Sequence, residues 1–428
     1  MSIPLSRLYD HLYHKSNHDI LIYGWIVHGS RKLEECVLLN SAVQGWVNQM
    51  TTPSLIMHDQ EPLNFDQWSV DDFLQYWDYA ISKYNLNEYQ KTPECLAHQI
   101  SLHLRGITHP ASNLYDKLII VHSEQQSNQV EIYKQHDYIP VYYWSHALIA
   151  ADWFRYAAHD PKLNYCTDQF DRDFLIYNRA WSGTREYRLK FAELMVTSGL
   201  ESSAIFKFSA MDNGKHYAEH QFVNPALSIQ HTTLDKHLET NTHPSSASAD
   251  YYSNDYVQSG MEIVLETLFD DSRWHLTEKT LRPIACGKPF MLVATAGSLQ
   301  YLQNYGFETF SEYINEEYDT ITDPVNRLNA IIAEMQRIRM LPPAEKQTLW
   351  KNLHEISARN KQRFFSETWQ TKVEQEFYNN LDAAMLETNH HCTGKYWAKS
   401  KSMPLSSGSR DRPDEQIQQL YQWLDTRN

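Results

Sequence analysis

The sequence predicts an α/β protein whose two lobes face a cleft. Its 428 residues exceed the roughly 250–300 residues at which a single core stops growing. In both halves of the chain, short apolar runs alternate with stretches of helical spacing, a pattern typical of sheets covered by helices. We expect an N-terminal lobe over residues 1–165, a C-terminal lobe over 166–385, and a polar, basic tail with a terminal helix over 386–428.

Apolar runs of strand length predict four strands in the N-terminal lobe. They are DILIYGWIV (19–27), SLIMHD (54–59), KLIIVHS (117–123) and YIPVYYW (138–144). Between them, residues 71–84 and 124–134 have the polar and apolar spacing of surface helices. Because strands and helices alternate, we expect the sheet to be parallel.

The C-terminal lobe shows the same alternation and ends in helices. In chain order we expect a strand over 173–179, a helix over 184–200, a loop over 241–254, a helix over 259–269, a strand over 288–294, a helix that begins near Ser298, and long charged helices over 324–386. Gly199 is a stop signal for the helix that precedes it.

Composition excludes several classes of protein. The chain has no window near the ~18 apolar residues of a membrane helix, and its first residues show no apolar signal segment, so we expect a cytoplasmic protein without a membrane partner. A net charge of -15 disfavours a general nucleic-acid binder. The five cysteines are scattered and form no C-x-x-C, which argues against disulfides or structural zinc.

The segment that begins at His275 can supply what a nucleotide-sugar donor needs. Glu278 can accept hydrogen bonds from both ribose hydroxyls, and Lys279 and Arg282, three residues apart on one helical face, can neutralise a diphosphate. Gly297 and Ser298 would begin the next helix, whose first amides favour phosphate. The alternative is a surface helix that binds nothing.

The triplet Thr277-Glu278-Lys279, followed by Gly-Lys-Pro before a strand, resembles the donor motif of α-1,3-fucosyltransferase-like glycosyltransferases with the GT-B fold. The stretch from Thr277 to Asp319 is also similar to a C-terminal region of glycosyltransferases of tailed bacteriophages. The resemblance implies two Rossmann-like lobes, with Glu278 and Lys279 contacting ribose and diphosphate. It further implies a UDP- or GDP-linked sugar as co-substrate, inversion at the sugar, and no metal or other cofactor.

Arginines follow the strand expected over 173–179. Ligands of open α/β sheets gather where strands end and helices begin, so Arg179 and Arg185 are candidates for the diphosphate site. Arginines in a first helical turn oppose the helix dipole and therefore need an explanation. The alternative is a helix start with solvated arginines.

The catalytic base is expected in the N-terminal lobe. Transfer needs a base within reach of the attacking hydroxyl, and a carboxylate at a strand end suits that role. Glu61 is the first candidate and Asp59 the second, because the fucosyltransferase-like enzymes have a similar Glu- and Pro-containing loop. His122 and His146 are further candidates, and an acidic turn without a catalytic role remains open.

Two metal-like patterns do not fit a metal site. Asp171 and Asp173 form a D-x-D, but it precedes its strand instead of following it. The His390-His391-Cys392 tract has no partner pair at zinc spacing.

The resemblance to phage enzymes suggests hydroxymethylcytosine in double-stranded DNA as the acceptor, with glucosyl or arabinosyl transfer. Such an enzyme needs a basic channel with aromatic side chains, and Lys395, Trp397 and Lys399 in the tail are candidates. Two alternatives stay open. One is a glycosyltransferase that acts on a glycan or a protein, and the other is an inactive GT-B-like binding protein.

Overall fold

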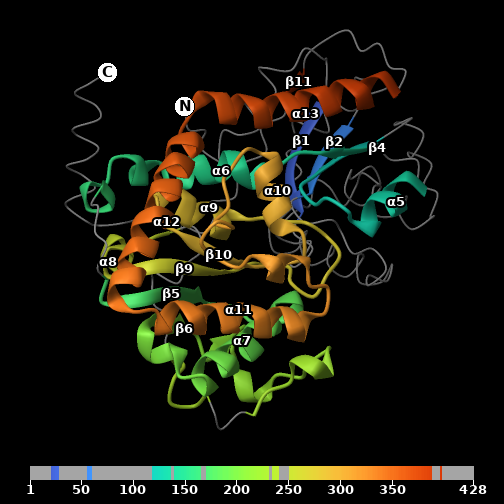
Figure 1. Ribbon diagram of the computed structural model, residues 1–428. Helices are drawn as coiled ribbons and strands as arrows, with labels where there is room; N and C mark the ends of the chain where they lie inside the picture. Colours follow the sequence, from blue (N-terminus) through green and yellow to red (C-terminus); the bar gives the residue numbers. More distant parts are fainter. Residues whose placement is uncertain are drawn as a thin grey trace.

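Two parallel sheets organise the chain (Figure 1). The computed structural model describes residues 21–27, 55–59, 118–135, 139–164, 170–230, 234–240, 250–387 and 396–397. The α/β class predicted from the sequence is confirmed.

The first sheet contains the four predicted strands and one short strand from the tail. Its strands are β1 (Leu21–Val27), β2 (Leu55–Asp59), β3 (Leu118–His122), β4 (Ile139–Tyr142) and β11 (Tyr396–Trp397). They lie in the order β11-β1-β2-β3-β4, and every pair is parallel. Asp59 at the end of β2 is in register with His122 at the end of β3.

Helical segments follow β3 and β4. They are α5 (Asn128–Gln135), α6 (Ser145–Trp153), η5 (Arg155–Ala158) and η6 (Pro161–Asn164). The helix expected over 124–134 is thus confirmed with a later start, whereas the one expected over 71–84 lies outside the described residues.

The second sheet contains β5 (Arg172–Asn178), β6 (Ala204–Phe208), β9 (Ser259–Leu265) and β10 (Phe290–Val293). Its strands are parallel and lie in the order β10-β9-β5-β6. After β5 the chain adds β6 on one side and then returns to add β9 on the other. The direction of winding therefore reverses between β5 and β9, which makes their carboxyl ends a topological switch point.

The helix expected over 259–269 is wrong, because these residues begin with strand β9. All seven residues of β9 are buried, since the strand lies in the middle of the sheet with helices on both sides. A strand that is buried on both faces has a continuous apolar sequence without alternation, and such a run cannot be told from a buried helix by periodicity.

The remaining described elements connect the strands of the second sheet or pack against one of the two sheets. They are η7 (Gly183–Arg185), α7 (Tyr187–Thr197), η8 (Leu200–Ser203), the hairpin β7 (Met211–Asp212) and β8 (Lys215–His216), η9 (Tyr217–Glu219), η10 (Pro225–Leu227), α8 (Ser253–Gln258), α9 (Glu278–Cys286), α10 (Ser298–Asn304), η13 (Glu317–Thr320), α11 (Pro324–Met340), α12 (Pro343–Phe364) and α13 (Glu367–Glu387). Gly199 has a left-handed backbone directly after α7, as a helix stop requires.

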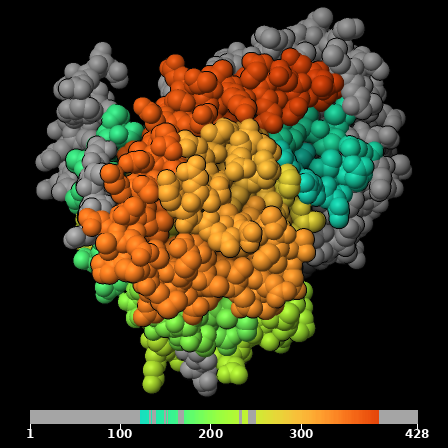
Figure 2. Space-filling view, in the orientation of Figure 1, coloured from blue at the N-terminus to red at the C-terminus, as the bar shows by residue number. Residues whose placement is uncertain are grey.

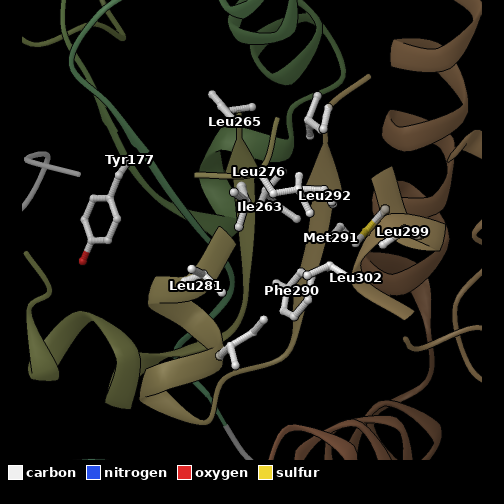
Figure 3. Packing of buried hydrophobic residues seen from close by; sticks show 14 of the residues in the cluster. Tyr177, Ile263, Leu265, Leu276, Leu281, Phe290, Met291, Leu292, Leu299 and Leu302 are labelled. Carbon is white, nitrogen blue, oxygen red and sulfur yellow. The ribbon is translucent and has the colours of Figure 1, made fainter. Parts of the chain in front are cut away.

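Apolar side chains of β9, β10 and the helices after them form the central core (Figure 3). Ile263, Leu281, Phe290 and Leu292 are almost completely buried. Helices α11 to α13 confirm the helical pattern expected over 324–386, and with α10 they cover much of the face seen in Figure 2. No helix in the described parts of the chain is long and apolar enough to cross a membrane.

Helix α13 returns to the first sheet. The Phe377 ring lies 5.0 Å from the Tyr143 ring, and the Asn380 side chain donates a hydrogen bond of 2.8 Å to the carbonyl of Tyr142 at the end of β4. The chain therefore ends its long helices against the sheet with which it began (Figure 1). The proposed boundaries at residues 165 and 385 stay predictions.

Gly260 offers a test of this packing. A Cβ atom there would lie 2.7 Å from the ring of Trp350, which α12 packs against β9. We expect Gly260→Ala to lower the free energy of unfolding by about 1–3 kcal/mol, because neither the central strand nor the buried ring can move easily. Chemical denaturation measures this. Trp350→Phe in the same background should recover part of the loss; strictly additive effects would contradict the contact.

Candidate functional site

A buried arginine joins the two strands at the switch point. Arg188, on α7, donates to the side-chain oxygen of Asn178 at 3.0 Å and to the carbonyl of Ala180 at 2.6 Å, both at the end of β5. Its other terminal nitrogen donates to the carbonyls of Leu265 and Glu266 at the end of β9, at 2.8 and 2.6 Å. Because the side chain is 3% exposed, Arg188 holds the edge together and does not face solvent.

Glu266 fixes the start of helix α9. Its buried carboxylate accepts hydrogen bonds from the backbone and hydroxyl of Thr277, at 3.0 and 2.8 Å, and from the backbone and hydroxyl of Thr280, at 3.3 and 2.6 Å. Burial alone would raise the pKa of Glu266, but the Lys279 ammonium and these donors outweigh burial and hold the pKa below its usual range. Glu266 is therefore an anion that serves as a structural cap.

Thr267, Lys279 and Thr184 form a polar cluster directly above this cap, which we call the switch-point cluster. Lys279 Nζ lies 3.3 Å from the hydroxyl of Thr267 and 3.1 Å from that of Thr277. The hydroxyl of Thr184 donates to the carbonyl of Thr267 at 3.1 Å. Thr184 is exposed and the Lys279 side chain is 20% exposed, so a cation and one hydroxyl group are presented at the carboxyl edge, while Thr267 is buried beneath them.

The two predicted arginines lie on the same edge. Arg179 directly follows β5 and is exposed. Arg185 is half-buried, and its Nε donates to the carbonyl of Ser182 at 3.1 Å. It also lies close enough to Asp212 to help lower the pKa of that carboxyl group. The structure thus leaves Arg179 open to a ligand and ties Arg185 to its own loop.

Glu278, expected to hold a ribose, is already in contact with two side chains. Its Oε1 lies 3.0 Å from Lys279 Nζ, and its Oε2 lies 3.2 Å from Nε2 of His146 on α6. Glu278 is 6% exposed and His146 is 3% exposed. The Glu278 carboxylate therefore lies next to the switch-point cluster but is covered by His146, which belongs to the helix after β4.

Arg282 does not share the surface of Lys279. It is 3% exposed, pairs with the buried Glu262 on β9, and lies over the ring of Tyr177 at 4.7 Å. Burial alone would lower the pKa of Arg282, but the Glu262 carboxylate outweighs this and raises it. Helix α9 runs antiparallel to β9, so one helical turn takes the chain from the open carboxyl edge into the core.

The amides expected to bind phosphate at the start of α10 are used within the chain. Gly297 N donates to the carbonyl of Asp319 at 2.8 Å, Ser298 N to that of Thr295 at 3.2 Å, and Leu299 N to the Asp319 carboxylate at 3.1 Å. Burial raises the pKa of Asp319 to about 6, although these amides oppose the rise. An internal carboxylate thus occupies the position predicted for a ligand.

The predicted base and acceptor residues lie mostly outside the described residues. Glu61, Lys395 and Lys399 are not described. Asp59 ends β2, and the backbone of Trp397 pairs with β1 at the outer edge of the first sheet.

Of the other base candidates, His122 ends β3 and is 4% exposed. Burial lowers the pKa of His122 to about 4, so its imidazole is neutral at pH 7. His146 lies in α6 and not at a strand end, and its side chain contacts Glu278.

A seam of hydrogen bonds joins the first sheet to the segment before α9. Gln125 and Trp274 exchange two backbone hydrogen bonds of 2.9 Å, and the Trp144 indole donates to the carbonyl of Leu276 at 2.7 Å. Arg273 pairs with the buried Glu124 at 3.1 Å. These contacts place the carboxyl ends of β3 and β4 against the segment that leads into the switch-point cluster.

The discounted D-x-D lies at the opposite edge. Asp173 is the second residue of β5 and pairs with Lys346 at 3.0 Å, so it belongs to the amino edge of the sheet. Among the described residues, no three His, Cys, Asp or Glu side chains lie together as a metal site. The tract at residues 390–392 is outside the described residues.

Sequence reasoning missed the residues that build the edge. Glu266, Thr267 and Arg188 carry no recognisable motif, and the helix expected over 259–269 hid the first two. A signal was present, since Glu266 and Thr267 are the first polar pair after the apolar run of β9.

Comparisons of the chain with protein families, with curated proteins and with solved structures found no match.

The different positions of Arg282 and Lys279 can be tested. We expect Arg282→Met to reduce stability by about 3–5 kcal/mol, because it leaves Glu262 buried without its cation. Denaturation curves measure this, and a second change, Glu262→Leu, should restore part of the stability. A fully stable Arg282→Met protein would contradict the buried pair.

Proposed function

We propose that this protein is a glycosyltransferase of the GT-B type, which moves a sugar from a nucleoside diphosphate to a hydroxyl group. The observation that carries the proposal is the position of Lys279 and its hydroxyl neighbours at the carboxyl edge of a parallel sheet, where its winding reverses. In open α/β sheets, ligands bind at such edges. The resemblance of Thr277-Glu278-Lys279 to a donor motif is independent of that geometry.

The cluster suits a diphosphate. Lys279 and Arg179 supply positive charge from α9 and from the end of β5, and the exposed Thr184 supplies a hydroxyl group, whereas the buried Thr267 hydroxyl contacts Lys279. As the acceptor oxygen bonds to the anomeric carbon, the bond from that carbon to the diphosphate breaks and negative charge grows on the leaving group. Cations fixed beside that charge stabilise the transition state more than the ground state.

The first sheet faces this edge and would carry the acceptor. The seam brings the end of β3 to the segment before α9, and Asp59 lies in register with His122 at that end. The acceptor's proton would pass to a carboxylate at the end of β2 or just after it, with Glu61 as first candidate and Asp59 as second.

For the acceptor we favour hydroxymethylcytosine in duplex DNA, with the tail residues Lys395, Trp397 and Lys399 as contacts. This choice rests on the resemblance to phage enzymes. The net charge of -15 favours the alternative acceptors, a glycan or a protein. An inactive binding protein is favoured by Glu278, whose two oxygens already have partners.

Lys279 provides the main test of the donor site. We expect Lys279→Ala to weaken binding of UDP or GDP by at least about tenfold, because a charge-assisted hydrogen bond contributes about 1.5–3 kcal/mol. Lys346→Ala is a matched control, since its side chain is 21% exposed and ion-paired at the amino edge. Isothermal titration that finds equal affinity in Lys279→Ala and wild type would rule out this site.

Glu61 tests the catalytic assignment. Glu61→Gln should bind the nucleotide like wild type but lose transfer, because the amide cannot take the acceptor's proton. Transfer is measured with radiolabelled nucleotide sugar and three acceptors: duplex DNA with hydroxymethylcytosine, the same DNA with cytosine, and a glycan mixture. An active Glu61→Gln protein would remove Glu61 as the base, and label only in the glycan would overturn the DNA acceptor.

A further inference from the structure

The contact between His146 and Glu278 joins the two halves of the molecule at the proposed donor site. His146 is the second residue of α6, which follows β4 of the first sheet, and Glu278 is the first residue of α9. Their side chains meet at 3.2 Å, and both are more than nine-tenths buried. This contact is a property of the folded chain that no sequence pattern indicates.

The contact blocks one side of the Glu278 carboxylate. A carboxylate that holds two vicinal hydroxyls of a ribose uses both of its oxygens as acceptors. In this structure Oε1 accepts from Lys279, which also belongs to the proposed site, whereas Oε2 lies 3.2 Å from Nε2 of His146, which does not belong to it. Since Glu278 is 6% exposed, a ribose cannot reach Oε2 while the imidazole stays in place.

The surrounding seam does not need to open for the imidazole to leave. The backbone bonds between Gln125 and Trp274 and the bond from Trp144 to Leu276 hold the two halves together without His146. The His275 ring packs edge-on against His146 at 5.1 Å, so His146 lies within a packed set of rings. Movement of the imidazole away from Oε2 would break none of these hydrogen bonds.

We propose that His146 gates the ribose site by competing with the nucleotide for Glu278. The inference rests on the proposed function, because it assumes that Glu278 binds the ribose of a nucleoside diphosphate. A ligand binds with reduced apparent affinity when only a fraction of the protein is in the binding-competent state. Removal of the imidazole therefore strengthens binding, and only for ligands that carry the ribose hydroxyls.

The test compares ligands with and without these hydroxyls. UDP and GDP, each beside its 2′,3′-dideoxy counterpart, are titrated calorimetrically into wild type and His146→Ala. We expect His146→Ala to bind the ribonucleotide roughly tenfold more tightly, which corresponds to about 1.4 kcal/mol, with the dideoxy ligand unchanged. His146→Gln keeps an N–H donor and should behave like wild type. If His146→Ala does not fold, His146→Ser carries the same expectation.

Trp144→Phe controls for a loosened seam. It removes the hydrogen bond to Leu276 but keeps an aromatic ring, so it should lower the unfolding temperature and leave nucleotide affinity unchanged. Equal tightening in Trp144→Phe, or equal tightening for the dideoxy ligands, would overturn the gate. Weaker ribonucleotide binding in His146→Ala would also overturn the gate, because it would show that the imidazole positions Glu278 for binding. If neither wild type nor any variant binds a nucleotide, the result contradicts the proposed function itself, and the gate is excluded with it.

Discussion

The carboxyl ends of β5 and β9 are held together by the four hydrogen bonds of Arg188, and the candidate site depends on this bridge. Adjacent strands separate at a switch point, because the chain leaves them in opposite directions. The buried guanidinium spans that gap by donating to the backbone carbonyls of Ala180, Leu265 and Glu266 and to the side-chain oxygen of Asn178. This bridging role also explains why Arg188 is the second residue of α7, a position at which the helix dipole disfavours a positive charge.

Glu266 extends the bridge to the next element. Its backbone carbonyl accepts from Arg188, while its carboxylate caps α9 through Thr277 and Thr280. The position of Lys279 follows, because it is the second residue of a helix whose start is fixed to the end of a strand. The position of the partly exposed Lys279 ammonium is thus fixed by buried polar groups. Such groups are costly to leave unpaired.

The sequence predicted the fold more successfully than the site. Apolar runs predicted most strands, because burial of one strand is a local property, but β9 is buried on both faces and its run looked helical. Spacing suggested that Lys279 and Arg282 share a surface, and only the packing of α9 on β9 shows that Arg282 is inside. The sequence also predicted that the amides at the start of α10 are available to a phosphate. It could not show that Asp319, in a later segment, folds back to accept their hydrogen bonds.

A thermal-shift screen of the purified protein against UDP, GDP, CDP and their sugars, with and without EDTA, tests the central claim most directly. The proposal predicts that one nucleoside diphosphate raises the unfolding temperature equally with and without EDTA, because the cations of the site belong to the protein. If no nucleotide shifts the unfolding temperature, the switch-point cluster is not a donor site.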